Sequence, residues 1–279
     1  MKWFSYLLMF VVILLSGTNV WSFERSRTDL NVPTSWETLP VVYYIAKQGS
    51  KDIADGSEIE AVKRSFETWQ SVNCSRLTFQ FGGLLAEPRA FYVPGGPNKN
   101  VVMWIENESD WPYPSDVLAV TQLEYNQQTG TILDADILMN GYAFQWSTDE
   151  QAKKDTHDVQ NVVTHEVGHL LGLDHTSVTE ATMFAEAPAE EVSKRALEKD
   201  DKDGLCTIYP QDERDQFGFL TVSTELGLAS CPSSSQQPTT NNPPERGLGC
   251  EVAETSGMML WLFLALCLIA FRRSVRVLS

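Results

Sequence analysis

The strongest constraint on this chain is the segment from residue 165 to residue 175, which has the sequence His-Glu-Val-Gly-His-Leu-Leu-Gly-Leu-Asp-His. On a helix, residues four positions apart lie on one face, so His165 and His169 can direct ring nitrogens at one ion. Gly172 can take a positive φ and end the helix, which lets the chain reverse and bring His175 to the same ion. Three protein ligands leave the fourth tetrahedral position to water, as in catalytic zinc sites. The sequence therefore predicts one zinc ion held by these histidines.

Glu166 follows the first histidine of this segment. It lies outside ligand geometry but close enough to the ion to act on a water there, which is where a general base must lie. The alternative is a helix whose histidines are only solvated or packed in a core. A chance match to the whole pattern is expected in about one such chain in a hundred thousand, so the catalytic interpretation is preferred.

Patterns outside the histidine segment predict a domain of helices and strands. Runs of β-branched and aromatic residues predict strands at 41–46, 76–81, 100–105, 117–125 and 131–139. Ser57 and Glu60 have the spacing of a capping box, which predicts the start of a helix. Four apolar residues recur there at helical spacing and are expected in the core: Ile59, Val62, Phe66 and Trp69. Asp155 or Thr156 is expected to cap the histidine helix. This order of elements fits an α+β domain with one twisted mixed sheet.

At the histidine segment the chain resembles the metzincin metalloproteases, whose motif His-Glu-x-x-His-x-x-Gly-x-x-His is matched without a gap. Met183 stands where the clan has its methionine turn, and Thr176 stands where the matrixin family usually has serine. The resemblance to matrixins, of the bacterial type, covers about residues 36 to 210 and includes a closing helix around 197–204. It implies a five-stranded mixed sheet, an active-site helix and two further helices.

The resemblance also implies how substrate binds, while the chain departs from the family pattern at its further metal sites. Substrate is expected to lie extended along a strand edge at 117–120, with Leu118 and Ala119 in contact. The segment after Met183 is expected to wall a substrate pocket. Calcium is a further candidate metal ion, which Asp134 and Asp136 or Asp200 and Asp201 would bind. A second zinc ion is not expected, because only His157 is left, and that residue is expected to be solvated in the first helical turn.

The two ends of the chain predict export and anchoring. Residues 1–22 resemble a signal peptide, with Lys2 before an apolar run, although an uncleaved anchor is the alternative. Residues 258–271 form a second apolar run of about 21 Å as a helix, shorter than the ~30 Å hydrocarbon core. Arginines follow it, at 272, 273 and 276. Together with Cys250, this end (250–279) resembles the C-terminal sorting signals of the myxobacterial kind. A Ser/Pro/Asn-rich linker at 211–249 would join it to the catalytic domain, 23–210.

The net charge limits the class of partner, and the positions of the cysteines limit the disulfide pairing. A net charge of −16 with no basic stripe argues against nucleic acid as a partner. Of the five cysteines, Cys250 and Cys267 lie in the C-terminal signal. In an oxidising compartment the expected disulfide joins Cys74 to Cys206, which leaves Cys231 without an assigned partner.

The function that fits these patterns is an exported, surface-tethered zinc endopeptidase with protein or peptide substrates and a monomeric catalytic domain. The alternative is a surface binding or adhesion module that keeps the fold and metal without turnover. Glu166 favours the enzyme, because a module that only binds has no need of a base beside the metal.

Overall fold

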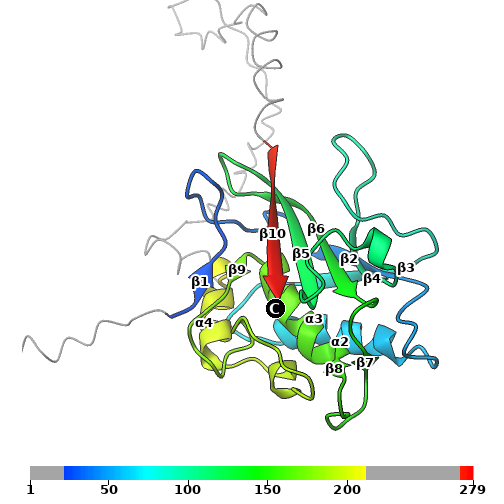
Figure 1. Cartoon of the computed structure of the whole chain (residues 1–279). Coiled ribbons are helices and arrows are strands. Elements are labelled where there is room, and N and C mark those ends of the chain that lie inside the picture. The colour runs from blue at the N-terminus through cyan, green and yellow to red at the C-terminus, as the bar shows by residue number, and fades with distance from the viewer. Residues whose placement is uncertain (1–21, 212–270, 279) are drawn as a thin grey trace, which may run out of the picture. The chain divides into compact units, whose positions relative to one another are not determined.

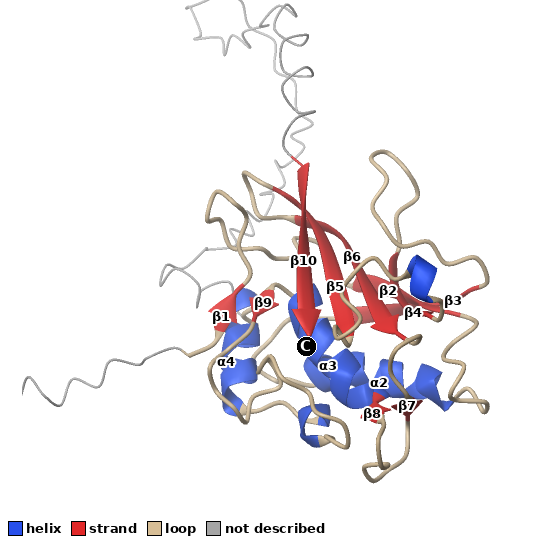
Figure 2. Ribbon diagram, in the orientation of Figure 1, coloured by secondary structure: helices blue, strands red, loops and turns tan. Residues whose placement is uncertain are grey.

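A twisted sheet covers two helices that lie side by side, as Figure 1 and Figure 2 show. This computed structural model describes residues 22–211 and the backbone of residues 271–278, which together form one compact unit. Helix α2 spans Ser57–Gln70 and helix α3 spans Val159–Leu170, and α3 packs against strands of the sheet as well as against α2. The third α-helix of the described residues, α4, spans Lys199–Ile208.

The sheet is mixed and has the order β3-β2-β4-β6-β5. Its strands are β2 (Val41–Ala46), β3 (Phe79–Leu85), β4 (Asn100–Ile105), β5 (Ala119–Asn126) and β6 (Ile132–Asn140). All neighbours run parallel except β5, which is antiparallel to β6. A sixth strand, β10 (Phe271–Leu278), pairs antiparallel with the other side of β5. The predicted α+β class, five-stranded mixed sheet and three helices are confirmed.

Shorter elements complete the domain. Two strand pairs lie outside the sheet: β1 (Glu24–Arg25) with β9 (Leu173–Asp174), and β7 (Trp146–Ser147) with β8 (His157–Asp158). The 3-10 helices are η1 (Glu108–Asp110) and η2 (Ser193–Arg195).

The structure corrects the starts of three strands: β5 begins at Ala119 and β6 at Ile132, one or two residues later than predicted, and β3 differs most. The strand predicted at 76–81 begins instead at Phe79, because the residues before it are tied to the end of α4. The Arg76 amide donates to the Tyr209 carbonyl at 3.0 Å, and Ser75 forms a bridge with Pro210. The backbone of residues 75 and 76 pairs with the residues just after α4, so the ladder with β2 starts only at Phe79.

The structure confirms that a helix starts at Ser57 and corrects the predicted cap of α3. The N-cap of α2 is Gly56, with φ at 75°, and no side chain caps this helix end. Glu60 pairs with Lys63 and so does not complete a capping box with Ser57. The N-cap of α3 is Asp158, whose carboxylate accepts from the Asn161 amide at 2.7 Å. The capping-box pattern thus marked the start of α2 correctly, although the box itself is not formed.

His157 and Asp158 cannot belong to a first helical turn, because they form strand β8 beside β7. The His157 amide donates to the Gln145 carbonyl at 2.8 Å, which keeps the backbone extended until α3 begins. The His157 ring is half-buried edge-on against Phe144, and burial lowers its pKa. The prediction of a solvated His157 in a helix is wrong.

Helix α2 provides the packing surface for α3. Its Val62, Phe66 and Trp69 are buried as predicted, while Ile59 is partly buried. The Trp69 indole donates to the Thr164 carbonyl at 2.8 Å, one residue before the first histidine. Because α2 is also stacked on the sheet through Phe66 and Tyr43, it fixes α3 relative to the strands.

Gly168 allows close packing on the buried side of α3. A Cβ at this position would lie 2.1 Å from the Met183 sulfur and 2.9 Å from the Trp69 ring. The absence of a side chain at Gly168 therefore lets the segment after the histidines reach the helix.

A disulfide joins the residues after α2 to α4. Cys74 and Cys206 are bonded, with their Cα atoms 5.5 Å apart. The Tyr209 hydroxyl, just past α4, donates to the Leu171 carbonyl at 2.9 Å. The closing helix is thereby attached to both α2 and α3.

Several predicted segments lie outside the described residues. These are the signal peptide except residue 22, the linker after residue 211, and the apolar run up to residue 270. Among the residues that the structure does describe, none of the helices has the length and hydrophobicity needed to span a bilayer.

Replacing both Cys74 and Cys206 with serine should lower the free energy of unfolding by about 2–4 kcal/mol, because the crosslink restricts a long loop of the unfolded chain. Urea unfolding of the oxidised proteins measures this change. Cys231→Ser is the matched control and should leave the midpoint unchanged. Equal midpoints for the double variant and the wild type would contradict a formed disulfide.

Gly168→Ala should destabilise the fold by about 1–3 kcal/mol, because overpacking outweighs the better helix propensity of alanine. Thermal unfolding measures it, and Met183→Ala in the same chain should recover part of the loss, since the sulfur is the nearest atom. A Gly168→Ala protein as stable as the wild type would show that the contact is not tight.

Candidate metal centre

The three predicted ligands converge on one point. Nε2 of His175 lies 3.2 Å from Nε2 of His165 and 3.1 Å from Nε2 of His169. Within the described part of the chain, these three residues form a group whose ligand atoms all lie within 4.8 Å of one another. Two nitrogens bound tetrahedrally to one zinc ion at ~2.0–2.1 Å lie roughly 3.3–3.4 Å apart. The observed spacing therefore fits a zinc ion.

Hydrogen bonds on the far side of the rings select the tautomer that binds a metal. Nδ1 of His165 lies 2.6 Å from the Thr182 carbonyl, and Nδ1 of His169 lies 3.0 Å from the Leu173 carbonyl. Since a carbonyl only accepts, each Nδ1 carries the proton and each Nε2 presents a lone pair. Burial, and then repulsion from His169, lowers the pKa of His165 well below its usual value, which keeps the ring neutral.

The glycine after α3 turns the chain toward the third ligand. Gly172 has φ at 95°, and a Cβ there would lie 2.4 Å from the Thr34 carbonyl oxygen. The next two residues form β9, which pairs with β1. The Asp174 carboxylate accepts from the His175 amide at 2.9 Å, so Asp174 positions the backbone of the third ligand.

The methionine segment packs against Gly168 of α3 and is held by Asp201. Met183 is buried. The two carboxylate oxygens of Asp201 accept from the amides of Thr182, at 2.8 Å, and Met183, at 3.0 Å. One of them also accepts from the Glu198 amide at 2.8 Å, as part of a capping box that starts α4. Asp201 therefore joins the methionine segment to the closing helix.

Glu166 is fully buried beside the ligands. The Thr121 hydroxyl lies 2.5 Å from its Oε2, whereas Oε1 is buried and has no hydrogen-bond partner among the described residues. Burial raises the pKa of Glu166 to about 8, although the bond from Thr121 opposes this shift. A cation bound at the histidines would also oppose it, since an opposite charge favours the ionised carboxylate.

A buried cation fixes the segment that follows Met183. The Lys194 side chain is 2% exposed, and its ammonium donates to the carbonyls of Phe184, at 2.5 Å, and Glu186. The Lys194 amide donates to the Asn161 side chain on α3 at 2.8 Å. Lys194 therefore fixes the segment predicted to wall the substrate pocket. Its ammonium binds the backbone of the segment, and its amide binds the Asn161 side chain of α3.

The predicted substrate edge lies at β5. Ala119 is the first residue of this strand and Leu118 directly precedes it, and both are buried. The outer side of β5 is paired along its length with β10, with Leu278 opposite Ala119. Contact between substrate and Leu118 or Ala119 stays a prediction.

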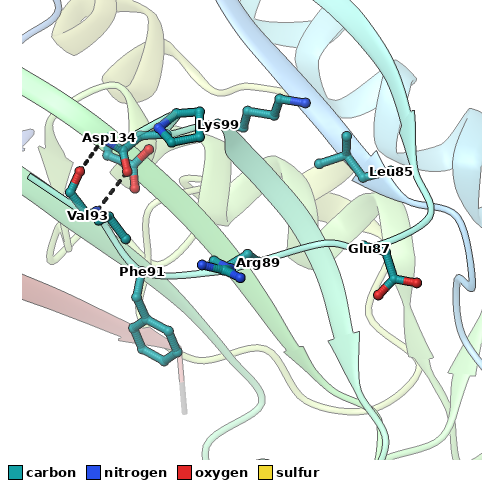
Figure 3. A pocket seen from close by; sticks show the side chains of 9 residues that line it. Leu85, Glu87, Arg89, Phe91, Val93, Lys99 and Asp134 are labelled. Carbon is teal, nitrogen blue, oxygen red and sulfur yellow. Dashed lines mark hydrogen bonds between the residues drawn. The ribbon is translucent and has the colours of Figure 1, made fainter. Parts of the chain in front are cut away.

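The predicted calcium ligands lie in two places. Asp136 accepts from the amides of Phe91 and Val101, so its carboxylate holds the loop before β4. Asp134 lines a separate pocket of about 360 Å³ (Figure 3). The acidic Glu87 and the basic Arg89 and Lys99 also line this pocket. The carboxylate of Asp201 is used by backbone amides, and that of Asp200 accepts from the Ser22 hydroxyl. Calcium therefore stays a prediction.

Three residues around the site were missed by the sequence analysis: Thr121, Asp201 as a support of the methionine segment, and Lys194. Spacing from Glu198 gives Asp201 a capping-box signal that could have been found. Thr121 is a hydroxyl in a row of buried apolar residues on β5, which is a weaker signal. Lys194 has no sequence signal, because nothing in its neighbourhood predicts that a lysine is buried.

Comparison with known proteins gives the family. The matrixin family model matches residues 35–210. Metalloendoproteinase 1-MMP of Arabidopsis thaliana is 25% identical over 203 residues, which cover 71% of this chain and 50% of that protein. Matrix metalloproteinase-27 of Tupaia belangeri is 24% identical over 186 residues, 62% of this chain and 30% of that protein. The chain thus spans half or less of the length of these relatives. The match covers strands β2 to β6, the three helices and the histidine site, and the chain belongs to the matrixin family.

Proposed function

We propose that this chain is an exported zinc-dependent endopeptidase, tethered at the cell surface, in which Glu166 is the general base. The observation that carries the proposal is the buried Glu166 carboxylate beside three imidazoles whose Nε2 atoms converge. The relatives are named as metalloendoproteinases, which supports the same reaction.

His165, His169 and His175 would hold the zinc ion, which supplies a Lewis acid that polarises the scissile carbonyl and makes water more acidic. Glu166 accepts the proton of the attacking water and then delivers it to the nitrogen of the departing amine. Oε1 is the oxygen available for this exchange, because Oε2 is engaged by Thr121. The burial of Glu166 excludes bulk water from the proton transfer.

Substrate is proposed to add to β5 as an antiparallel strand. The ladder between β5 and β10 supports this geometry, because it uses the same outward-facing backbone groups over residues 119–126. A substrate strand and β10 cannot occupy that edge together. If the apolar run before β10 is inserted in a membrane with its arginines on the cytoplasmic side, β10 is removed from β5 and the edge is free.

Export and tethering are proposed from the ends of the sequence, and the disulfide supports an oxidising compartment. The competing proposal, a surface binding module without turnover, would keep the same ligands. It gives no reason for a buried carboxylate beside the three imidazoles, whose Oε1 has no hydrogen-bond partner among the described residues.

Zinc removal and Glu166→Ala should each abolish peptide cleavage. A quenched peptide library is incubated with the full chain and with a chain that ends at residue 230, each with and without chelator. Glu166→Ala should lower kcat/KM by about 10²–10⁴-fold, as expected for loss of a general base. Glu180→Ala, at an exposed carboxylate, is the matched control and should be unaffected. Absence of chelator-sensitive cleavage in both folded, zinc-loaded chains would support the binding module instead.

Removing residues 250–279 should move the protein from the membrane fraction to the medium, because the truncated chain lacks the apolar run. Fractionation of cells that express each form, followed by immunoblotting, measures this change. Equal release of the two forms would contradict the tether.

A further inference from the structure

We propose that Thr121 is a positioning residue that fixes the Glu166 carboxylate and directs one of its oxygens to proton transfer; this inference rests on the proposed function. Thr121 lies in β5 and Glu166 in α3, and neither is exposed. The Thr121 hydroxyl lies 2.5 Å from Oε2 of Glu166 and 3.0 Å from the Glu166 carbonyl.

The hydroxyl has one proton to donate, so the two acceptors compete for it. The carboxylate takes it, because it is the closer acceptor and a charged acceptor forms the stronger bond. The carbonyl of Glu166 belongs to the middle of a helix and is served by the helical hydrogen bond. The contact between Thr121 and Glu166 is therefore directed at the side chain.

The bond makes the two carboxylate oxygens different. Oε2 is held by the sheet, while Oε1 is buried with no hydrogen-bond partner among the described residues. A carboxylate held at one oxygen cannot rotate freely, so the other oxygen keeps one direction. A fixed base saves the cost of orienting it at each turnover.

The surroundings of Thr121 indicate that its hydroxyl serves to hold the Glu166 carboxylate. The residues on the same face of β5, Ala119 and Leu123, are fully buried and apolar. Burying a hydroxyl among them costs free energy unless it is hydrogen-bonded. Lys194 is the cation near Glu166, but its ammonium donates to the carbonyls of Phe184 and Glu186. The Oε2 bond is thus provided by Thr121.

The test compares Thr121→Val, which keeps the β-branched shape, with Thr121→Ser, which keeps the hydroxyl, in the zinc-loaded full chain. Valine should lower kcat about tenfold or more and leave KM within about twofold, since the backbone edge of β5 is unchanged. Serine should stay within about threefold of the wild type. Thr164→Val is the matched control, because that hydroxyl bonds to the Gln160 carbonyl within α3. Thr121→Ala gives the same comparison should the valine variant not fold.

A second measurement does not depend on activity. In zinc-free protein, a double-mutant cycle of Thr121→Val and Glu166→Met should show coupling of about fivefold in the unfolding equilibrium constant, as expected for one hydrogen bond. Additive effects would overturn the contact.

The outcomes separate this inference from the function on which it rests. A wild-type chain that cleaves peptides with chelator sensitivity, while Thr121→Val keeps the same kcat, overturns the inference alone. A loss of activity that serine fails to rescue also overturns it. A wild-type chain that cleaves nothing overturns the proposed function and this inference with it.

Discussion

The site depends on two hydrogen bonds from histidine Nδ1 atoms to backbone carbonyls, because these bonds decide which nitrogen faces the centre. The carbonyl that holds His165 belongs to Thr182, whose own amide is held by Asp201 at the start of α4. The carbonyl that holds His169 belongs to Leu173, in the short pair β1 and β9. The orientation of the ligands therefore reflects the folding of both ends of the domain, and the disulfide between Cys74 and Cys206 closes the same assembly.

The sequence could predict the parts of this structure that are set by local spacing. His165 and His169 lie on one helix face because they are four residues apart. The positive φ of Gly172, after the helix, then brings His175 back to them. Strands β2 and β4 have the predicted bounds, since their apolar runs are short and distinct. The order of elements was enough to identify the α+β class.

The parts that could not be predicted depend on contacts between distant residues. Asp158 caps α3 because β8 pairs with β7, and no local signal distinguishes it from Asp155 or Thr156. The contact between Thr121 and Glu166 joins residues 45 positions apart and depends on which face of β5 meets α3. Asp201 has a local signal as a cap, but its bonds to the methionine segment follow from where α4 packs.

The buried ammonium of Lys194 limits which changes in length and backbone path the segment from Phe184 to Glu191 can tolerate. Burial lowers the pKa of Lys194, while Glu191 and Asp201 act in the opposite direction. Its ammonium donates to backbone carbonyls and lies 4.0 Å from the Glu191 carboxylate, so the length and path of the segment are more restricted than the identity of its other side chains. A loop grafted from another member of the matrixin family would need the same number of residues, or an apolar residue in place of the lysine, to avoid leaving an uncompensated charge in the interior.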